Sequence, residues 1–166
     1  RNLTNTKIVE EDCAGIDVYD KIDWKYIFHF AARGEVYWCK DNPGEAVDIN
    51  IGGTVTMLEL AKNLKIDHFY FADTSAEYDS LTESMYFPSS ELMAPNVFTP
   101  MGFYPITKMA ASQFVRSYGK KNNFGTTLFR YTNVYGPSMN LERDIPPVVG
   151  SFTNHMLFKN EQAVIY

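Results

Sequence analysis

The feature of this 166-residue chain that most constrains its fold is the alternation of short apolar runs with longer segments of helical periodicity. Aromatic and β-branched residues fill positions 26–31, 68–72 and 126–131, and such runs predict buried strands. Helical patterns at 42–63 and 103–121 separate them. Strands joined by helices are typical of a mostly parallel sheet with crossover connections. We therefore expect an α/β protein.

The first of these helices has a clear predicted start. Asn42, Pro43 and Glu45 offer an N-cap side chain, a proline at the first helical position and a glutamate three residues after the cap. These are the elements of a capping box. An apolar stripe follows at helical spacing, consisting of Val47, Ile51, Val55, Leu58 and Ala61.

The other segments give weaker signals. We expect a loop at 32–41, a helix at 148–157 and a terminal strand at 162–166. Nearly thirty residues, 73–101, separate one strand from the next helix. Loops of that length are usually functional.

Composition excludes several classes of protein. A net charge of -5 leaves no basic face for a nucleic-acid backbone. Cys13 and Cys39 lack the spacing of a disulfide framework or a metal site, and His29, His68 and His155 lack ligand spacing. No apolar run approaches the roughly 20 residues that cross a bilayer, and the first residues form no signal peptide. We expect a cytoplasmic protein that contacts neither membrane nor nucleic acid.

Tyr104 and Lys108 are the candidate catalytic pair. They lie four residues apart at the start of a helix, so both side chains project from one face. A phenol with a pKa of about 10 needs nearby positive charge to act as a base at neutral pH, and Lys108 can supply it. Thr74 follows a strand, and the carboxyl ends of such strands gather catalytic groups. The alternative for Tyr104 and Lys108 is a pair on the helix surface.

Five segments resemble, in order and separation, the extended short-chain dehydrogenase/reductases that act on nucleotide sugars. They are FHFAA at 28–32, NIGGT at 50–54, FADTSAEY at 71–78, YPITK at 104–108 and LFRYTNVYGP at 128–137. The resemblance covers residues 9–166 and is closest to 4-epimerases and 4,6-dehydratases. It implies a Rossmann-like sheet with helices on both faces and NAD as the cofactor.

The resemblance also implies a role for each candidate residue. Tyr104 matches the general base, and Lys108 matches the lysine that stabilises the phenolate and binds the nicotinamide ribose. Thr74 matches the hydroxyl that bridges the tyrosine and the sugar oxygen, with Ser75 as a possible substitute. Asn133 matches a substrate-binding asparagine, and its alternative is an ordinary turn residue.

Residues expected beside the cofactor share positions with the family's dinucleotide contacts. They are Asp12, Cys13, Phe30, Ala31, Ala32, Asn50, Tyr104, Lys108 and Tyr131. Asp12 is alternatively a helix cap, and the segment 30–32 is alternatively an ordinary buried strand. Asn50 lies on an apolar helix face, where an amide must be hydrogen-bonded, and in the family this residue fixes the loops around the site. Arg33, Arg130 and Arg143 could each meet a diphosphate, and the sequence does not choose among them.

One departure from the family pattern concerns the phosphate-binding turn. The ten glycines do not form a G-x-x-G-x-x-G turn, and residues 7–9 resemble the family's third strand. We expect an internal piece of a longer polypeptide that lacks the first two strands and most of the C-terminal lobe. Residues 1–166 would form a partial NAD-binding domain, with the substrate lobe starting at about 138–160. Strand 26–31 would then expose apolar side chains.

Three functions follow from these patterns. The first is an NAD-dependent nucleotide-sugar 4-epimerase, and the second is a 4,6-dehydratase that uses Glu77. In dehydratases the glutamate follows the catalytic threonine directly, whereas here Ser75 and Ala76 intervene. The third is a non-catalytic binding or scaffolding relative. The resemblance also implies a homodimer formed through the helices at 42–63 and 103–121.

Overall fold

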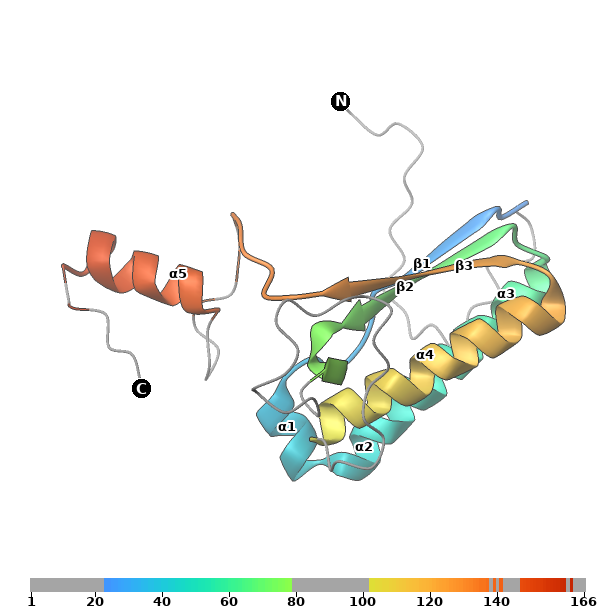
Figure 1. Ribbon diagram of the computed structural model, residues 1–166, viewed down its shortest axis with the longest axis horizontal. Coiled ribbons are helices and arrows are strands. Elements are labelled where there is room, and N and C mark those ends of the chain that lie inside the picture. The colour runs from blue at the N-terminus through green and yellow to red at the C-terminus, as the bar shows by residue number, and fades with distance from the viewer. Residues whose placement is uncertain are drawn as a thin grey trace. The chain divides into compact units, whose positions relative to one another are not determined.

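The computed structural model describes residues 23–78, 102–137, 139, 141, 147–160 and 162 (Figure 1). The chain divides into two compact units, Arg1–Arg130 and Tyr131–Tyr166. The structure does not describe Asp12, Cys13, Arg143 or the predicted strand at 7–9. Of the predicted strand at 162–166, it describes residue 162 alone.

The first unit contains a three-stranded sheet in the order β1-β2-β3. The strands are β1 (Tyr26–His29), β2 (His68–Thr74) and β3 (Gly125–Tyr131). β1 and β2 are parallel, with Tyr26 opposite His68 and His29 opposite Phe71. The helix α4 (Phe103–Asn122) connects β2 to β3. The predicted α/β crossover arrangement is therefore confirmed, although β1 ends two residues earlier than predicted.

The segment between β1 and β2 is more helical than predicted. It contains α1 (Val36–Asp41), α2 (Pro43–Val47), the π-helix η3 (Asp48–Gly52) and α3 (Gly53–Leu64). The predicted loop at 32–41 is thus wrong over most of its length. The capping box is also wrong, because the Asn42 side chain makes no cap hydrogen bond to α2. Its Nδ2 instead donates to the Trp38 carbonyl at 3.0 Å, at the end of α1.

The π-helix changes which residues face the core. Val47 was predicted to lie in the apolar stripe, but its side chain is 46% exposed. The buried positions from α2 to α3 are Ala46, Asn50, Thr54, Met57, Leu58 and Ala61. A π-turn holds more residues than an α-turn. The buried positions 46, 50 and 54 precede the predicted ones by one residue, whereas Leu58 and Ala61 lie where the stripe was predicted. This displacement brings the polar side chains of Asn50 and Thr54 inside.

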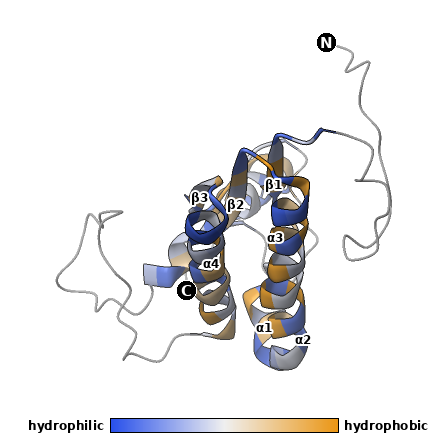
Figure 2. Ribbon diagram, turned by 90° about the vertical axis from the view of Figure 1, so that its right-hand side faces the viewer, coloured by the Kyte–Doolittle hydropathy of each residue, from blue (hydrophilic) through white to orange (hydrophobic). Residues whose placement is uncertain are grey.

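The core lies between the sheet and two helices. In Figures 1 and 2, α3 and α4 lie side by side beneath the strands, and α1 and α2 lie on the same side. The core side chains come from α3, β2, α4 and the turn before β3, and include Leu58, Ala61, Phe69, Phe71, Ala111, Val115 and Phe124. Phe69 and Phe71 both belong to the core because alternate residues of β2 face the helices.

The opposite face of the sheet carries a row of aromatic rings. Phe28 stacks on Tyr70 with centroids 4.4 Å apart, and Tyr70 stacks on Phe129 at 6.0 Å. Tyr26 and Phe28 are 55% and 58% exposed. The expected exposure of apolar side chains on this strand is therefore found among the described residues.

The second unit contains α5 (Val148–Thr153), which continues into the π-helix η5 (Asn154–Phe158). The predicted helix at 148–157 is confirmed, and its second half has π geometry. Gly150 is buried, and a Cβ there would meet the side chains of Met139 and Leu141. Across the described parts of both units, no helix combines the length and apolarity needed to span a membrane.

Candidate active site

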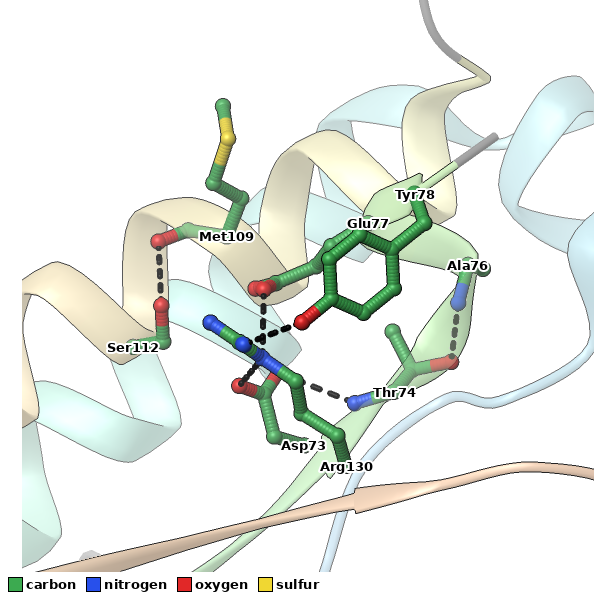
Figure 3. Close-up of polar contacts among 8 residues, drawn as sticks. All are labelled: Asp73, Thr74, Ala76, Glu77, Tyr78, Met109, Ser112 and Arg130. Carbon is green, nitrogen blue, oxygen red and sulfur yellow. Dashed lines mark hydrogen bonds and ion pairs between the residues drawn. The ribbon is translucent and has the colours of Figure 1, made fainter. Parts of the chain in front are cut away.

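Thr74 is held where β2 passes into the 3-10 helix η4 (Ser75–Tyr78). The Thr74 N–H donates to Asp73 Oδ1 at 3.0 Å, and Thr74 Oγ1 accepts from the Ala76 N–H at 3.2 Å (Figure 3). The Thr74 side chain is buried. Such local bonds between side chains and backbone fix the direction in which a short hydroxyl points. Ser75, the first residue of η4, is half-buried.

The first turn of α4 brings Tyr104 to this hydroxyl. The Thr74 hydroxyl lies close enough to the Tyr104 phenol to lower its pKa. Pro105 is tolerated in the first turn of α4 because the N–H groups of a first turn have no partner inside the helix, so the helix loses no hydrogen bond to a proline there. The structure therefore brings together a strand-end threonine and a helix-start tyrosine, as the sequence pattern placed them.

Lys108 lies one turn further along α4 and is 3% exposed. Its Nζ lies 4.1 Å from the centroid of the Phe71 ring, a cation–π contact. Burial lowers the pKa of Lys108 to about 8, although the negative charges of Asp73 and Glu77 partly oppose this shift. The ammonium form is thus only modestly favoured at neutral pH.

The pKa of Tyr104 departs from the expectation. Burial raises the pKa of the phenol, and the charges of Asp73 and Cys39 raise it further, while the hydrogen bond with Thr74 lowers it. Lys108 is not among the groups that shift the pKa of Tyr104 in this structure, and its ammonium lies over the Phe71 ring. In this geometry the phenol is protonated at neutral pH. Base action by Tyr104 requires added positive charge beside its ring.

Asn50 ties the loop after β1 to the start of α4. Its Oδ1 accepts from the Arg33 N–H at 2.8 Å, and its Nδ2 donates to the Arg33 carbonyl at 3.1 Å and to Thr107 Oγ1 at 3.0 Å. Thr107 Oγ1 in turn donates to the Tyr104 carbonyl at 2.9 Å. A buried amide whose bonds are all made supports its neighbours rigidly. Asn50 therefore acts on the loop and on the Tyr104 backbone.

His29 ends β1 beneath the same network. Its Nε2 lies 3.1 Å from Thr54 Oγ1, and the Thr54 hydroxyl donates its hydrogen to the Asn50 carbonyl at 2.7 Å. Because that hydrogen is used, we infer that His29 donates through Nε2–H. Burial and the charge of Lys108 lower the pKa of His29 to about 4. His29 is therefore a buried, hydrogen-bonded residue of the sheet.

The carboxyl end of β1 is open to solvent. Phe30 is 55% exposed, and Ala31 and Ala32 are also exposed. β1 and β2 are parallel, so this segment lies at the same edge of the sheet as Thr74. Two methyl side chains leave the backbone accessible. The alternative of an ordinary buried strand at residues 30–32 is therefore wrong, and the cofactor role of these residues stays a prediction.

Arg130 forms a buried ionic cluster that the sequence did not predict. Its Nε lies 3.3 Å from Glu77 Oε2 and 3.8 Å from Asp73 Oδ2. Its NH1 donates to the Tyr78 hydroxyl, and its guanidinium carbon lies 5.2 Å from the centroid of the Tyr78 ring. Arg130 was one of three diphosphate candidates, but these contacts turn it inward. The available signal was an arginine inside an apolar strand, which must pair with a buried acid.

The two acids of this cluster are fully enclosed. The side chains of Asp73 and Glu77 are 0% and 1% exposed. Within the described residues, Asp73 Oδ2 and Glu77 Oε1 have no hydrogen-bond partner. Burial, and then repulsion from Glu77, raises the pKa of Asp73 to about 7. One arginine therefore faces two carboxyl groups that resist being charged together.

For three other predicted residues, the structure gives the exposure or the local contacts but does not test their roles. Tyr131 is 42% exposed and Asn133 is exposed, and both belong to the second unit. Their cofactor and substrate roles stay predictions. Arg33 is engaged locally, with its guanidinium carbon 4.8 Å from the centroid of the Trp38 ring and NH1 3.7 Å from Glu35.

Comparisons with known proteins agree with this geometry. Residues 2–165 match the model of the NAD dependent epimerase/dehydratase family. The chain is 34% identical over 128 residues to the "Probable UDP-glucuronate 4-epimerase" of Rhizobium meliloti (strain 1021), covering 76% of this chain and 36% of that protein. It is 31% identical over 121 residues to the UDP-glucuronate 4-epimerase of Thermodesulfobacterium geofontis (strain OPF15), covering 73% and 36%.

The fold is also similar to that of a solved structure. This is the UDP-N-acetylglucosamine 4-epimerase from Methanobrevibacter ruminantium M1 in complex with UDP-N-acetylmuramic acid, with a TM-score of 0.85 and 26% identity. The match covers 99% of this chain and 51% of that one. The chain thus spans between about a third and a half of the length of these proteins.

Proposed function

Since the chain belongs to the NAD-dependent epimerase/dehydratase family, we propose that it carries the catalytic residues of a nucleotide-sugar 4-epimerase that uses NAD. The observation that carries the proposal is the meeting of the Thr74 hydroxyl and the Tyr104 phenol at the carboxyl end of β2, with Lys108 buried one turn away. The similar proteins described above are named as 4-epimerases of UDP-sugars, which favours a nucleotide sugar as substrate.

Each residue has a chemical task in this proposal. NAD, when bound, supplies the hydride acceptor and donor at the sugar C4 and a positively charged ring. Tyr104 takes the proton of the C4 hydroxyl and later returns one. Thr74 holds the phenol and the sugar oxygen in line through its hydroxyl. Lys108 contributes positive charge to the site and would hold the ribose of the cofactor, while the exposed residues 30–32 would lie beside the dinucleotide.

The same site supports an epimerase better than a dehydratase. A dehydratase needs an additional acid that the sugar can reach. Glu77 is 1% exposed and lies 3.3 Å from Arg130, so it is occupied within the protein. A carboxyl group enclosed against an arginine inside the protein does not reach a bound sugar.

The test is turnover by the full-length polypeptide with UDP-, GDP-, CDP- and dTDP-sugars, with the products separated by anion exchange and identified by NMR. We expect an epimer inverted at C4. Tyr104→Phe should lower kcat by roughly 100-fold or more, because a positioned proton-transfer group contributes about that much. Tyr37→Phe is the matched control, since Tyr37 is 60% exposed on α1.

Each other outcome would reject part of the proposal. Full activity of Tyr104→Phe would remove Tyr104 as the base. A 4-keto-6-deoxy product would establish a dehydratase. The absence of product from every sugar would favour a non-catalytic relative.

A further inference from the structure

Arg130 joins three elements beside Thr74. Asp73 comes from the end of β2, Glu77 and Tyr78 come from η4, and Arg130 comes from β3. Figure 3 shows the Arg130 side chain between the two carboxyl groups and the Tyr78 hydroxyl. The Arg130 side chain is only 19% exposed. The cluster therefore forms a largely buried ionic link across the sheet end.

Thr74 lies between the two segments that this link holds. Asp73 precedes Thr74 and accepts a hydrogen bond from its N–H, and η4 follows it. The Thr74 hydroxyl is oriented by the Ala76 N–H of η4. A movement of η4 away from β2 would therefore rotate that hydroxyl away from Tyr104.

We propose that Arg130 is a positioning residue, which fixes the direction of the Thr74 hydroxyl by holding η4 and the end of β2 together. The inference rests on the proposed function for its consequence in catalysis. Arg130 itself acts only through Glu77, Tyr78 and Asp73.

A purely structural role would not require such a cluster. Burying charged groups costs more desolvation free energy than apolar residues of similar volume, which could fill the same space. The planar guanidinium group of an arginine, in contrast, can contact several acceptors in a fixed arrangement. That property suits an element that must hold a catalytic turn in one orientation.

The charge of the cluster also affects the rest of the site. Asp73 and Glu77 act electrostatically on Lys108, and Asp73 acts on Tyr104. Three other titratable groups lie around these residues. The charge of Lys108 lowers the pKa of His29, Cys39 raises the pKa of Tyr104, and Tyr78 on η4 accepts from Arg130. Loss of Arg130 removes a positive charge beside Asp73. The pKa of Asp73 should therefore rise, and the acidic limb of the pH profile should move to higher pH.

The experiment compares Arg130→Gln, Arg130→Lys and the control Arg116→Gln, an exposed arginine on α4. We expect Arg130→Gln to lower kcat by about 10- to 100-fold with little change in KM, as for a slightly misplaced catalytic group. Arg130→Lys, which keeps the charge, should restore part of this loss. Arg116→Gln should match the parent in rate and pH profile.

A second readout does not depend on turnover. Amide hydrogen exchange at Ala76, followed by NMR, should accelerate in Arg130→Gln and stay unchanged in Arg116→Gln, because this N–H donates to Thr74 Oγ1. A folded Arg130→Gln protein with parental kcat and parental exchange at Ala76 would overturn the proposal. If the parent lacks turnover, the proposed function fails while the exchange still decides the role of Arg130.

Should Arg130→Gln fail to fold, Glu77→Gln replaces it, since the amide keeps the shape of the side chain and can still accept from Arg130. We expect a smaller fall in kcat and a shift of the acidic limb to lower pH, because Asp73 loses a neighbouring negative charge. Parental rate, pH profile and exchange in this variant would overturn the proposal as well.

Discussion

Replacing Asp73 with asparagine should remove a large pH dependence of stability. Burial raises the pKa of Asp73 from 3.8 to about 7. Between these values the folded protein holds a proton that the unfolded chain has lost. The resulting stability is fully present below pH 3.8 and is lost as the pH rises through about 7.

The size of the effect follows from the two pKa values. Their separation corresponds to about 4 kcal/mol, at about 1.4 kcal/mol for each factor of ten in proton affinity. Because Asp73 and Glu77 interact, this free energy belongs to the pair. Asp73→Asn keeps an oxygen that can accept from the Thr74 N–H and cannot ionise. The free energy of unfolding of the variant, relative to the parent, should therefore rise by a few kcal/mol across this pH range.

The assay is urea unfolding followed by circular dichroism between about pH 4 and pH 8, with the difference between variant and parent taken at each pH. His29 acts in the opposite direction, because its pKa is lowered from 6.5 to about 4 and its contribution to stability is lost as the pH falls through that range. Because variant and parent both contain His29, its contribution cancels when their free energies of unfolding are subtracted. Asp48→Asn, at an exposed carboxylate on η3, is the control.

Two results would contradict this reasoning. A difference that stays constant with pH would mean that Asp73 ionises in the folded protein as it does in the unfolded chain. A difference that falls with rising pH would mean that Arg130 stabilises the carboxylate more than burial penalises it.

Two further substitutions test packing and polar support. Gly119→Ala should destabilise the protein by roughly 1–3 kcal/mol despite better helix propensity, since a Cβ there would lie 2.5 Å from Thr126 Cγ2. Adding Thr126→Ser should recover part of the loss of melting temperature, and a melting temperature above that of the parent in Gly119→Ala would refute the clash. Asn50→Ala should cost roughly 3 kcal/mol in urea unfolding because it removes the partners of the Arg33 N–H and carbonyl and the donor to the buried Thr107 hydroxyl. Asn50→Asp should not rescue this loss, since a carboxylate cannot donate to the Arg33 carbonyl; parental stability of either variant would contradict the argument.

Local sequence patterns were sufficient to predict the framework of the fold. The runs at 68–72 and 126–131 became β2 and β3 with small changes of boundary, and α4 ended within one residue of its predicted end. Apolar periodicity determines such elements because strands and helices bury residues at fixed spacings. The same spacing placed Tyr104 and Lys108 on one helix after the strand that leads to Thr74.

Choices between competing partners could not be predicted in this way. Asn42 had every local feature of an N-cap, yet its amide bonds the end of the preceding helix. The π-helix η3 moved the buried face by one residue and brought Asn50 into contact with Arg33 and Thr107. A wider turn leaves no separate signature in the spacing of apolar residues.

The sequence by itself determined the order of strands and helices and the residue types at the site. Only the tertiary structure decided that Arg130 pairs with Glu77 and Asp73. Arg130 in β3 also bonds Tyr78 in η4, which lies 52 residues earlier in the chain, and no local pattern links residues so far apart. Only burial in the folded protein raised the pKa values of Asp73 and Tyr104. Desolvation and charge pairing depend on which groups surround a side chain in space, and that environment exists only once distant segments have packed together.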